Sequence, residues 1–139
     1  MNSVENIKKE LLKFSSAAKK EKYYQYFQAF PGGYGEGDEF YGVTVPEQRK
    51  LAKKFYNEIS LEEAFQLLEN PVHECRLTSV FILVLKFQKT KDENIKQKIL
   101  HNNYRKLLRR DAAHLGSFQV KDDGFVLELN SSFIINIYN

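Results

Sequence analysis

The sequence predicts an all-α protein built as a solenoid of helical repeats, with an irregular or strand-like C-terminal tail. Three observations indicate this fold. Apolar residues recur at spacings of three and four through most of residues 4–108, which is the period of an α-helix. Short turns separate successive helical segments, as in stacked helix–turn–helix pairs. After residue 110 this period is lost, and runs of Val, Phe and Ile favour strand.

The first helical segment runs from Val4 to Phe30. Ser15 and Ser16 lie between two groups of helically spaced apolar residues and indicate two helices rather than one. Residues 31–33 (Pro-Gly-Gly) end the segment, and the glycine-rich, acidic stretch to residue 42 is expected to be a loop. This loop lacks the Gly-Lys-Ser/Thr ending of a phosphate-binding P-loop, so a plain turn is the simpler interpretation.

The next two helices form the first predicted pair. Pro46 suits the first helical position because its missing N–H has no partner there, and the helix is expected to reach Asn57. The stretch 60–63 (Ser-Leu-Glu-Glu) then matches a capping box, which starts a helix that ends at residues 70–71 (Asn-Pro).

A second pair is predicted from Val72 onward. The helix from Val72 to Phe87 is apolar nearly all round and is therefore expected to lie at the centre of the fold. Asp92 is expected to cap a further helix through residue 108. Each pair has an apolar face that only stacking can bury. We expect a helical-repeat domain over residues 1–110 and a divergent tail over 111–139.

Composition restricts the class of protein without fixing its function. The formal charge of +3 and the pI near 8.9 are compatible with a phosphate-bearing partner, although many proteins without one have similar values. A single cysteine, Cys75, excludes an intramolecular disulfide. The N-terminal sequence does not resemble a signal peptide, and no stretch is long and apolar enough for a membrane span. We therefore expect a cytoplasmic protein with no membrane partner.

Two segments carry a more specific signal. YYQYFQAFPGGYGEGDEFYGVTVPEQRKLAKKF, followed later by NPVHECRLTSVFILVLKF, resembles the signature of AlkD-type DNA alkylation repair enzymes. The resemblance is strong over about half of the chain. It implies a HEAT-like (ARM-type) helical-repeat fold whose concave basic face holds alkylated double-stranded DNA, and hydrolysis of the N-glycosidic bond of cationic N3- or N7-alkylated purines.

The resemblance also implies DNA-binding residues. Tyr26 matches a family tyrosine that faces the DNA cleft, while Thr44 and Val45 match a helix entry near the DNA backbone. A helix N-terminus suits phosphate because its unpaired N–H groups point outward. The basic residues that follow on the same helix are expected phosphate contacts, namely Arg49, Lys50 and Lys53.

The expected catalytic segment departs from the family pattern. Family members carry an Asn-Trp-Asp-x-Val-Asp type segment, whereas this chain has NNYRKLLRRDAAHLGSF at that position and contains no tryptophan. No catalytic residue is therefore assigned, and Asp111 in particular is not. We expect a truncated family member with partial DNA binding and weak or no glycosylase activity. The alternative is a catalytically inert helical-repeat module that binds protein.

Other candidate residues are given structural interpretations. HECRL lacks the second histidine of a zinc-protease motif, so no metal or cofactor is expected. Glu74 is explained by the dipole at a helix N-terminus. Arg76 is expected to pair with a carboxylate of an adjoining repeat, with a DNA contact as the alternative. Structural or exposed roles are expected for Cys75, His101 and His114. The oligomeric state stays open.

Overall fold

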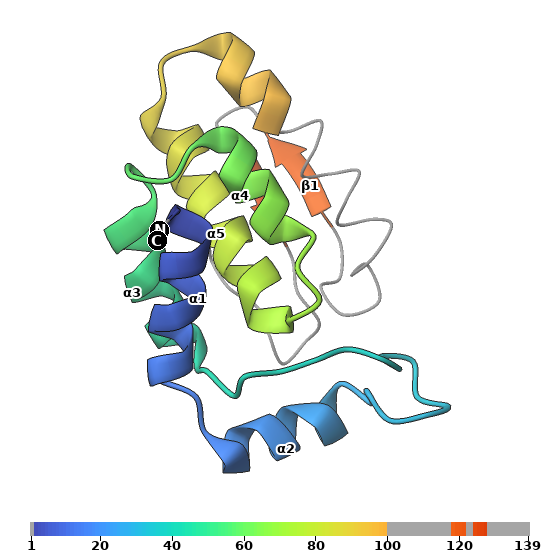
Figure 1. Cartoon of the computed structure of the whole chain (residues 1–139). Coiled ribbons are helices and arrows are strands. Elements are labelled where there is room, and N and C mark those ends of the chain that lie inside the picture. Colours follow the sequence, from blue (N-terminus) through green and yellow to red (C-terminus); the bar gives the residue numbers. More distant parts are fainter. Residues whose placement is uncertain (1, 100–117, 122–123, 128–139) are drawn as a thin grey trace. The chain divides into compact units, whose positions relative to one another are not determined.

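The computed structural model describes residues 2–99 and the strand residues 118–121 and 124–127 (Figure 1). Its elements are α1 (Ser3–Lys13), α2 (Ala17–Tyr26), α3 (Val45–Phe55), α4 (Leu61–Leu68), α5 (His73–Lys89), β1 (Phe118–Lys121) and β2 (Gly124–Leu127). A further helical segment covers residues 93–99. The predicted all-α fold with a strand-like tail is confirmed. The chain divides into two compact units, Met1–Leu85 and Lys86–Asn139, whereas the predicted boundary at residue 110 stays a prediction.

The break between α1 and α2 lies where the sequence predicts it. Ser16 is the N-cap of α2, and its hydroxyl oxygen accepts a hydrogen bond from the Lys19 N–H at 3.3 Å. α2 ends four residues before the predicted Phe30. The reason is Gln28, which has a φ of +53° and lets the Ala29 N–H bond back to the Tyr24 carbonyl at 3.0 Å. This is a Schellman ending with glutamine where glycine is usual.

α3 and α4 begin at defined caps. α3 starts at Val45, one residue before the predicted Pro46. The capping box of α4 is confirmed, because the Glu63 N–H donates to the Ser60 hydroxyl at 3.1 Å and the Ser60 N–H donates to the Glu63 carboxylate at 3.2 Å. The same carboxylate accepts a hydrogen bond from the Ser3 N–H at 3.2 Å, which ties the start of α1 to the start of α4.

α5 is the central helix of the first unit, as its sequence predicts. Every residue from His73 to Val84 is buried. Its Ser79 hydroxyl donates to the Ala64 carbonyl of α4 at 2.6 Å, and α1 packs against both α3 and α4 (Figure 1). The buried polar residues of α5 are what its apolar pattern did not predict: His73, Glu74, Arg76, Thr78 and Ser79.

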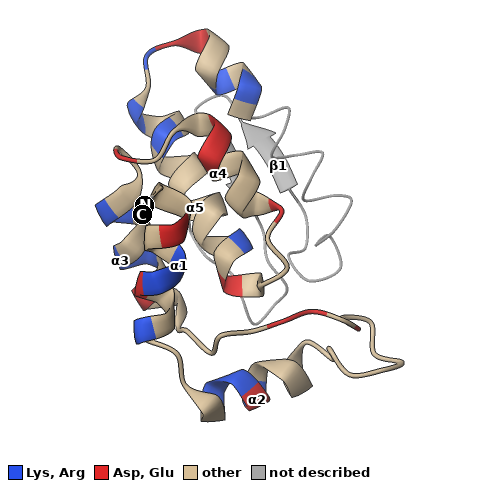
Figure 2. Cartoon of the chain, in the orientation of Figure 1, with Lys and Arg blue, Asp and Glu red and all other residues tan. Residues whose placement is uncertain are grey.

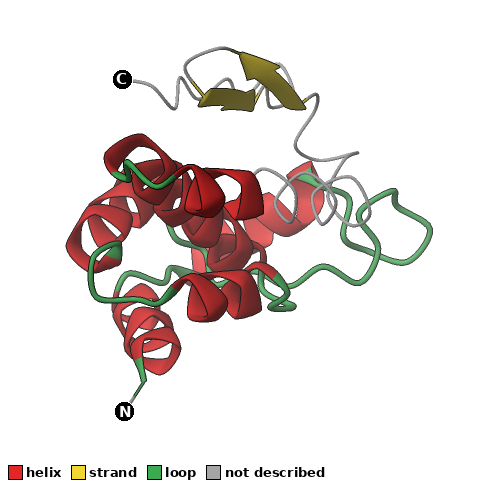
Figure 3. Ribbon diagram, turned by 90° about the horizontal axis from the view of Figure 1, so that it is seen from above, coloured by secondary structure: helices red, strands yellow, loops and turns green. Residues whose placement is uncertain are grey.

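The second unit contains a capped helix start and a hairpin. The Asn94 N–H donates to the Asp92 carboxylate at 2.9 Å, which confirms the predicted cap. The rest of that helix, up to residue 108, lies outside the described residues. β1 and β2 pair antiparallel, with Phe118 opposite Leu127 and Lys121 opposite Gly124 (Figure 3). The strand preference of the tail is therefore confirmed for these eight positions.

Candidate nucleic-acid interface

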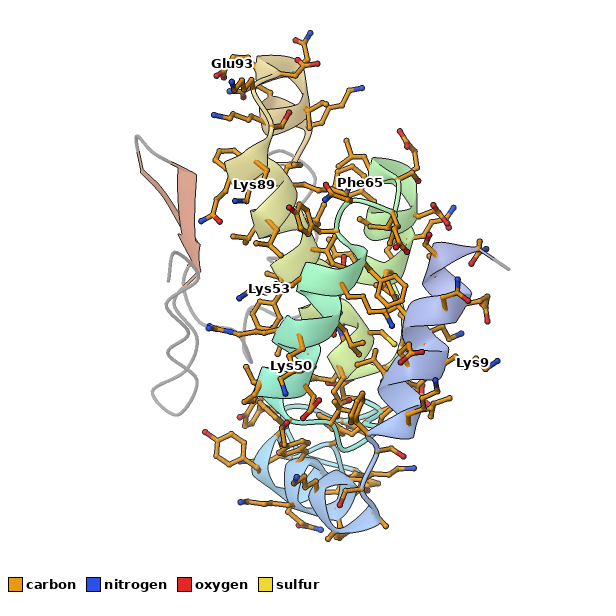
Figure 4. All side chains as sticks on the ribbon, turned by 90° about the vertical axis from the view of Figure 1, so that its left-hand side faces the viewer. Lys9, Lys50, Lys53, Phe65, Lys89 and Glu93 are labelled. Atoms are coloured by element: carbon orange, nitrogen blue, oxygen red, sulfur yellow. The ribbon has the colours of Figure 1, made fainter. Side chains whose placement is uncertain are left out.

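α3 separates a buried face from a basic one. Lys50, Lys53 and Lys54 are exposed, and among the described residues none of the three forms an ion pair. Figure 2 marks the basic residues of α3 in blue, together with those of α1, α2 and α5, and Figure 4 shows Lys50 and Lys53 projecting outward from α3. The opposite face packs into the core through Gln48, Leu51, Ala52 and Phe55. The ammonium of Lys54 lies 5.3 Å from the ring centroid of Phe55. Lys50 and Lys53 are therefore the lysines of this face best placed to meet an anionic partner.

Arg49 lies at the edge of this basic face. Its guanidinium carbon is 5.4 Å from the ring centroid of Phe81 on α5, and the residue is half-buried. A guanidinium over an aromatic face gains cation–π and packing energy. Arg49 therefore has a structural role beside any contact it makes with a ligand, in contrast to Lys50 and Lys53.

The entry to α3 contains Thr44 and Val45, both partly exposed. Thr44 is the N-cap residue, but its side chain makes no capping hydrogen bond. Ser16 and Ser60 do cap their helices. The first-turn N–H groups of α3 therefore lack a side-chain acceptor from their N-cap, at the end of the helix where the backbone dipole favours negative charge.

Tyr26 lies on α2 with 42% of its surface exposed. Its ring meets Phe27 edge-on, with centroids 4.9 Å apart. Lys19 and Lys22 precede it by seven and four residues, are exposed, and so share its face of the helix. The sequence interpretation missed these two lysines, although their spacing from Tyr26 was visible.

α2 and α3 are adjacent where both helices begin. The Ser16 N–H donates to the Gly42 carbonyl at 3.1 Å. Gly42 has a φ of +81°, and a Cβ there would lie 2.2 Å from the Ser16 carbonyl oxygen and 2.7 Å from the Lys20 nitrogen. Only glycine permits this approach. The approach brings the basic first turn of α2 next to the entry of α3.

Beneath this entry lies a fully buried carboxylate, Glu74, in the first turn of α5. One of its oxygens accepts a hydrogen bond from the Tyr41 N–H at 3.0 Å. The other accepts from the Gly42 N–H at 2.8 Å and from the Val43 N–H at 3.0 Å. The dipole explanation for Glu74 was therefore incomplete, because the carboxylate also holds three successive backbone groups of the loop.

The same loop is held at a second point by Arg76. Its Nη2 lies 2.9 Å from each carboxylate oxygen of Asp38, and its Nη1 donates to the Asn70 and Pro71 carbonyls at 3.1 and 2.9 Å. The predicted pairing of Arg76 with a carboxylate is confirmed, but the partner belongs to the glycine-rich loop and not to a helix of an adjoining repeat. We refer to Asp38, Glu74 and Arg76 together as the clasp. It joins the glycine-rich loop to the start of α5.

His73 completes the surroundings of Asp38. Its Nδ1 is 3.5 Å from the Asp38 carboxylate. Burial acts to raise the pKa of Asp38, but the hydrogen bond from His73 and the charge of Arg76 outweigh it, so this pKa lies below its ordinary value. The imidazole also packs on Phe27 and Phe40, whose rings stack 5.5 Å apart. His73 is thus a core residue.

The other candidate residues are Cys75, His101 and His114, for which the sequence predicts structural or exposed roles. Cys75 is buried, and burial raises the pKa of its thiol to about 12. His101 and His114 lie outside the described residues. The described part of the chain contains no cluster of three or more potential metal ligands. None of the helices in that part is long and apolar enough to cross a membrane.

These elements define a helical-repeat-like protein with a basic helix face at its surface. Residues 7–113 match the family described as DNA alkylation repair enzyme, and the chain belongs to that family. The chain matches no curated protein and no solved structure in the same comparisons. The position expected to carry the family's Trp-Asp segment falls among residues 100–117, outside the described residues.

Proposed function

We propose that this chain binds alkylated duplex DNA through α2 and α3 and hydrolyses the N-glycosidic bond weakly or not at all. The observation that carries the proposal is the exposed, unpaired lysines of α3 beside an uncapped helix entry, in a member of a DNA alkylation repair family. Lysines neutralise phosphates, and first-turn N–H groups donate hydrogen bonds to an anion. The contact residues are Tyr26, Thr44, Val45, Arg49, Lys50 and Lys53, with Lys19 and Lys22 added from the structure.

Weak catalysis follows from the absence of tryptophan in the 139 residues. Purines alkylated on a ring nitrogen are already good leaving groups, so the enzyme's task is to stabilise positive charge on the sugar. A carboxylate and an aromatic face at the deoxyribose suit that task. Neither is assigned in this chain. The truncated repeat array expected from the sequence stays a prediction, as does the cytoplasmic location.

The test measures fluorescence anisotropy of a labelled duplex, with and without one N7-alkylated guanine, over a range of salt concentrations. Lys50→Glu is compared with Lys9→Glu, which makes the same charge change on α1. The Lys9 side chain is exposed and projects away from α3 (Figure 4). We expect Lys50→Glu to weaken binding about tenfold and to lower the salt slope by about one. Lys9→Glu should have little effect.

Equal effects of the two variants would contradict the α3 face as the binding site. No anisotropy change with wild type at low salt would reject DNA binding and favour the protein-binding alternative. Release of the alkylated base is measured on the same duplex. A release rate about 10⁶-fold or more above that without protein, as in an ordinary enzyme, would contradict the proposal of weak or absent catalysis.

A further inference from the structure

We infer that Glu74 is a positioning residue for the DNA-binding entry of α3, an inference that rests on the proposed function. The Glu74 side chain does not reach the protein surface, because it is fully buried. Its two carboxylate oxygens accept hydrogen bonds from the N–H groups of Tyr41, Gly42 and Val43 at 2.8–3.0 Å. These three residues directly precede Thr44, the N-cap of α3.

The path from Glu74 to α3 is short and continuous. The Val43 N–H bonds to Glu74, and the Val43 carbonyl accepts a hydrogen bond from the side-chain amide of Gln48 at 3.1 Å. The backbone N–H of Gln48 donates to the Thr44 carbonyl at 3.1 Å, the first helical bond of α3. Val43 is therefore fixed from one side by α5 and from the other by α3. The orientation of the entry depends on both.

The choice of a carboxylate is specific to this role. A carboxylate accepts hydrogen bonds at both oxygens, so it can satisfy three converging N–H donors. Glutamine has the same shape, but one oxygen becomes an NH2 group that points at donors and cannot accept. At least one buried N–H then loses its partner, which is costly away from water. Glu74→Gln should release the backbone of residues 41–43 without creating a cavity.

A positioned entry binds phosphate better than a mobile one, because the entropy of ordering the backbone is lost on folding rather than on binding. Loss of the Glu74 carboxylate should therefore weaken DNA binding, although Glu74 itself does not contact DNA. The remaining clasp contact, between Arg76 and Asp38, still holds the loop at Asp38, five residues upstream of Val43. Its presence favours a local rather than a global effect.

The experiment compares Glu74→Gln with Ser79→Ala in the full chain. Ser79 is also buried on α5 and also loses a hydrogen bond, but its partner is Ala64 of α4. Hydrogen exchange by mass spectrometry should show exchange at residues 41–48 faster by about tenfold in Glu74→Gln and unchanged in Ser79→Ala. DNA affinity at low salt should fall about tenfold, with a smaller salt slope, in Glu74→Gln alone.

The outcomes separate this inference from the proposed function. If wild type binds DNA and Glu74→Gln binds with the same affinity and slope, the positioning role is overturned while the proposed function stands. Unchanged exchange at residues 41–48 also overturns it. If wild type binds no DNA, both fail. If Glu74→Gln does not fold, Glu74→Asp replaces it, because the shorter side chain draws the carboxylate away from the N–H groups of residues 41–43 and should produce the same pattern in a smaller measure.

Discussion

Nη2 of Arg76 lies 2.9 Å from both carboxylate oxygens of Asp38, across 38 residues of sequence. The pair is nearly inaccessible to water, with side-chain exposures of 4% and 7%. Arg76 belongs to the HECR segment and Asp38 to the YGEGD segment, the two stretches that carry the family resemblance. The structure gives both segments a common physical role, because together they fasten the loop that leads into α3.

Asp38→Asn should reduce stability in a pH-dependent way. The folded pKa of Asp38 is below its ordinary value, so its stabilising contribution is present above the unfolded pKa of about 3.9 and is lost as pH falls through the folded value. We expect Asp38→Asn to lower the free energy of unfolding by about 3 kcal/mol at neutral pH, because Arg76 loses its buried partner. Urea unfolding should show this gap shrinking toward about pH 3.

The matched control for Asp38→Asn is Glu10→Gln. Glu10 pairs with Lys13 at 2.9 Å on the exposed side of α1. A surface ion pair contributes little to stability, so we expect a small effect at either pH. A gap for Asp38→Asn that stays constant from neutral to acid pH would contradict a depressed pKa for Asp38.

Gly42→Ala should be far more destabilising than Gly37→Ala. Gly42 has a φ of +81° and Gly37 has a φ of +87°, so both substitutions carry the same backbone strain of about 1 kcal/mol. A Cβ at Gly37 meets nothing within 4 Å, whereas one at Gly42 would lie 2.2 Å from the Ser16 carbonyl oxygen. Thermal unfolding should show an additional loss of about 2 kcal/mol or more for Gly42→Ala. Equal losses would mean that α2 does not approach Gly42 this closely.

The thiol of Cys75 should react only when the protein unfolds. Cys75 is fully buried, and its thiol pKa is raised to about 12, chiefly by burial. Thiolate is the reactive form, so at about pH 8 the native thiol is both inaccessible and protonated. Ellman's reagent should label the chain immediately in urea and only at the unfolding rate in buffer. Rapid labelling of the native protein would place Cys75 at the surface.

The sequence predicted helices well and buried polar contacts poorly. Periodicity located α5, and the capping box located the start of α4, because both signals depend on residues close in sequence. The clasp depends on Asp38 meeting Arg76, and this pairing is set only when α5 packs against the loop. The sequence therefore predicts that Arg76 pairs with a carboxylate but does not identify Asp38 as its partner, and it predicts for Glu74 only the helix-dipole role.

The candidate interface also combines features that the sequence predicts with contacts that only the packing of distant segments sets. The lysines of α3 follow from helical spacing, which predicts that Lys50 and Lys53 face away from the core. The position of Arg49 over Phe81 does not, since Phe81 belongs to a helix that begins 18 residues after α3 ends. The sequence also does not predict the early end of α2 at Tyr26, because a non-glycine residue, Gln28, occupies the left-handed position after it.

Gln28→Gly should stabilise the protein by about 1 kcal/mol. Gln28 has a φ of +53°, and glycine adopts this conformation without the Cβ penalty. Gln25→Gly is the matched control, because Gln25 is exposed and lies inside α2, where glycine should cost about 1 kcal/mol. The two substitutions should therefore change the urea midpoint in opposite directions. A decrease for both would show that Gln28 is not strained.

Arg49→Ala and Lys50→Ala should separate stability from DNA affinity. Arg49 packs over the Phe81 ring, so its loss should lower the free energy of unfolding by about 1 kcal/mol as well as weaken DNA binding. Lys50 is exposed and forms no ion pair within residues 2–99, so its removal should leave the thermal midpoint within about 1 °C of wild type.

Both alanine variants should lower DNA affinity about threefold to tenfold at low salt, as expected for the loss of one phosphate contact. Arg49→Lys isolates the aromatic contact, because it keeps the charge but loses the planar guanidinium. It should keep most of the DNA affinity and still lower the thermal midpoint. If Arg49→Lys instead lost affinity while keeping full stability, Arg49 would bind DNA through its fork of N–H donors, and the Phe81 contact would contribute nothing to the fold.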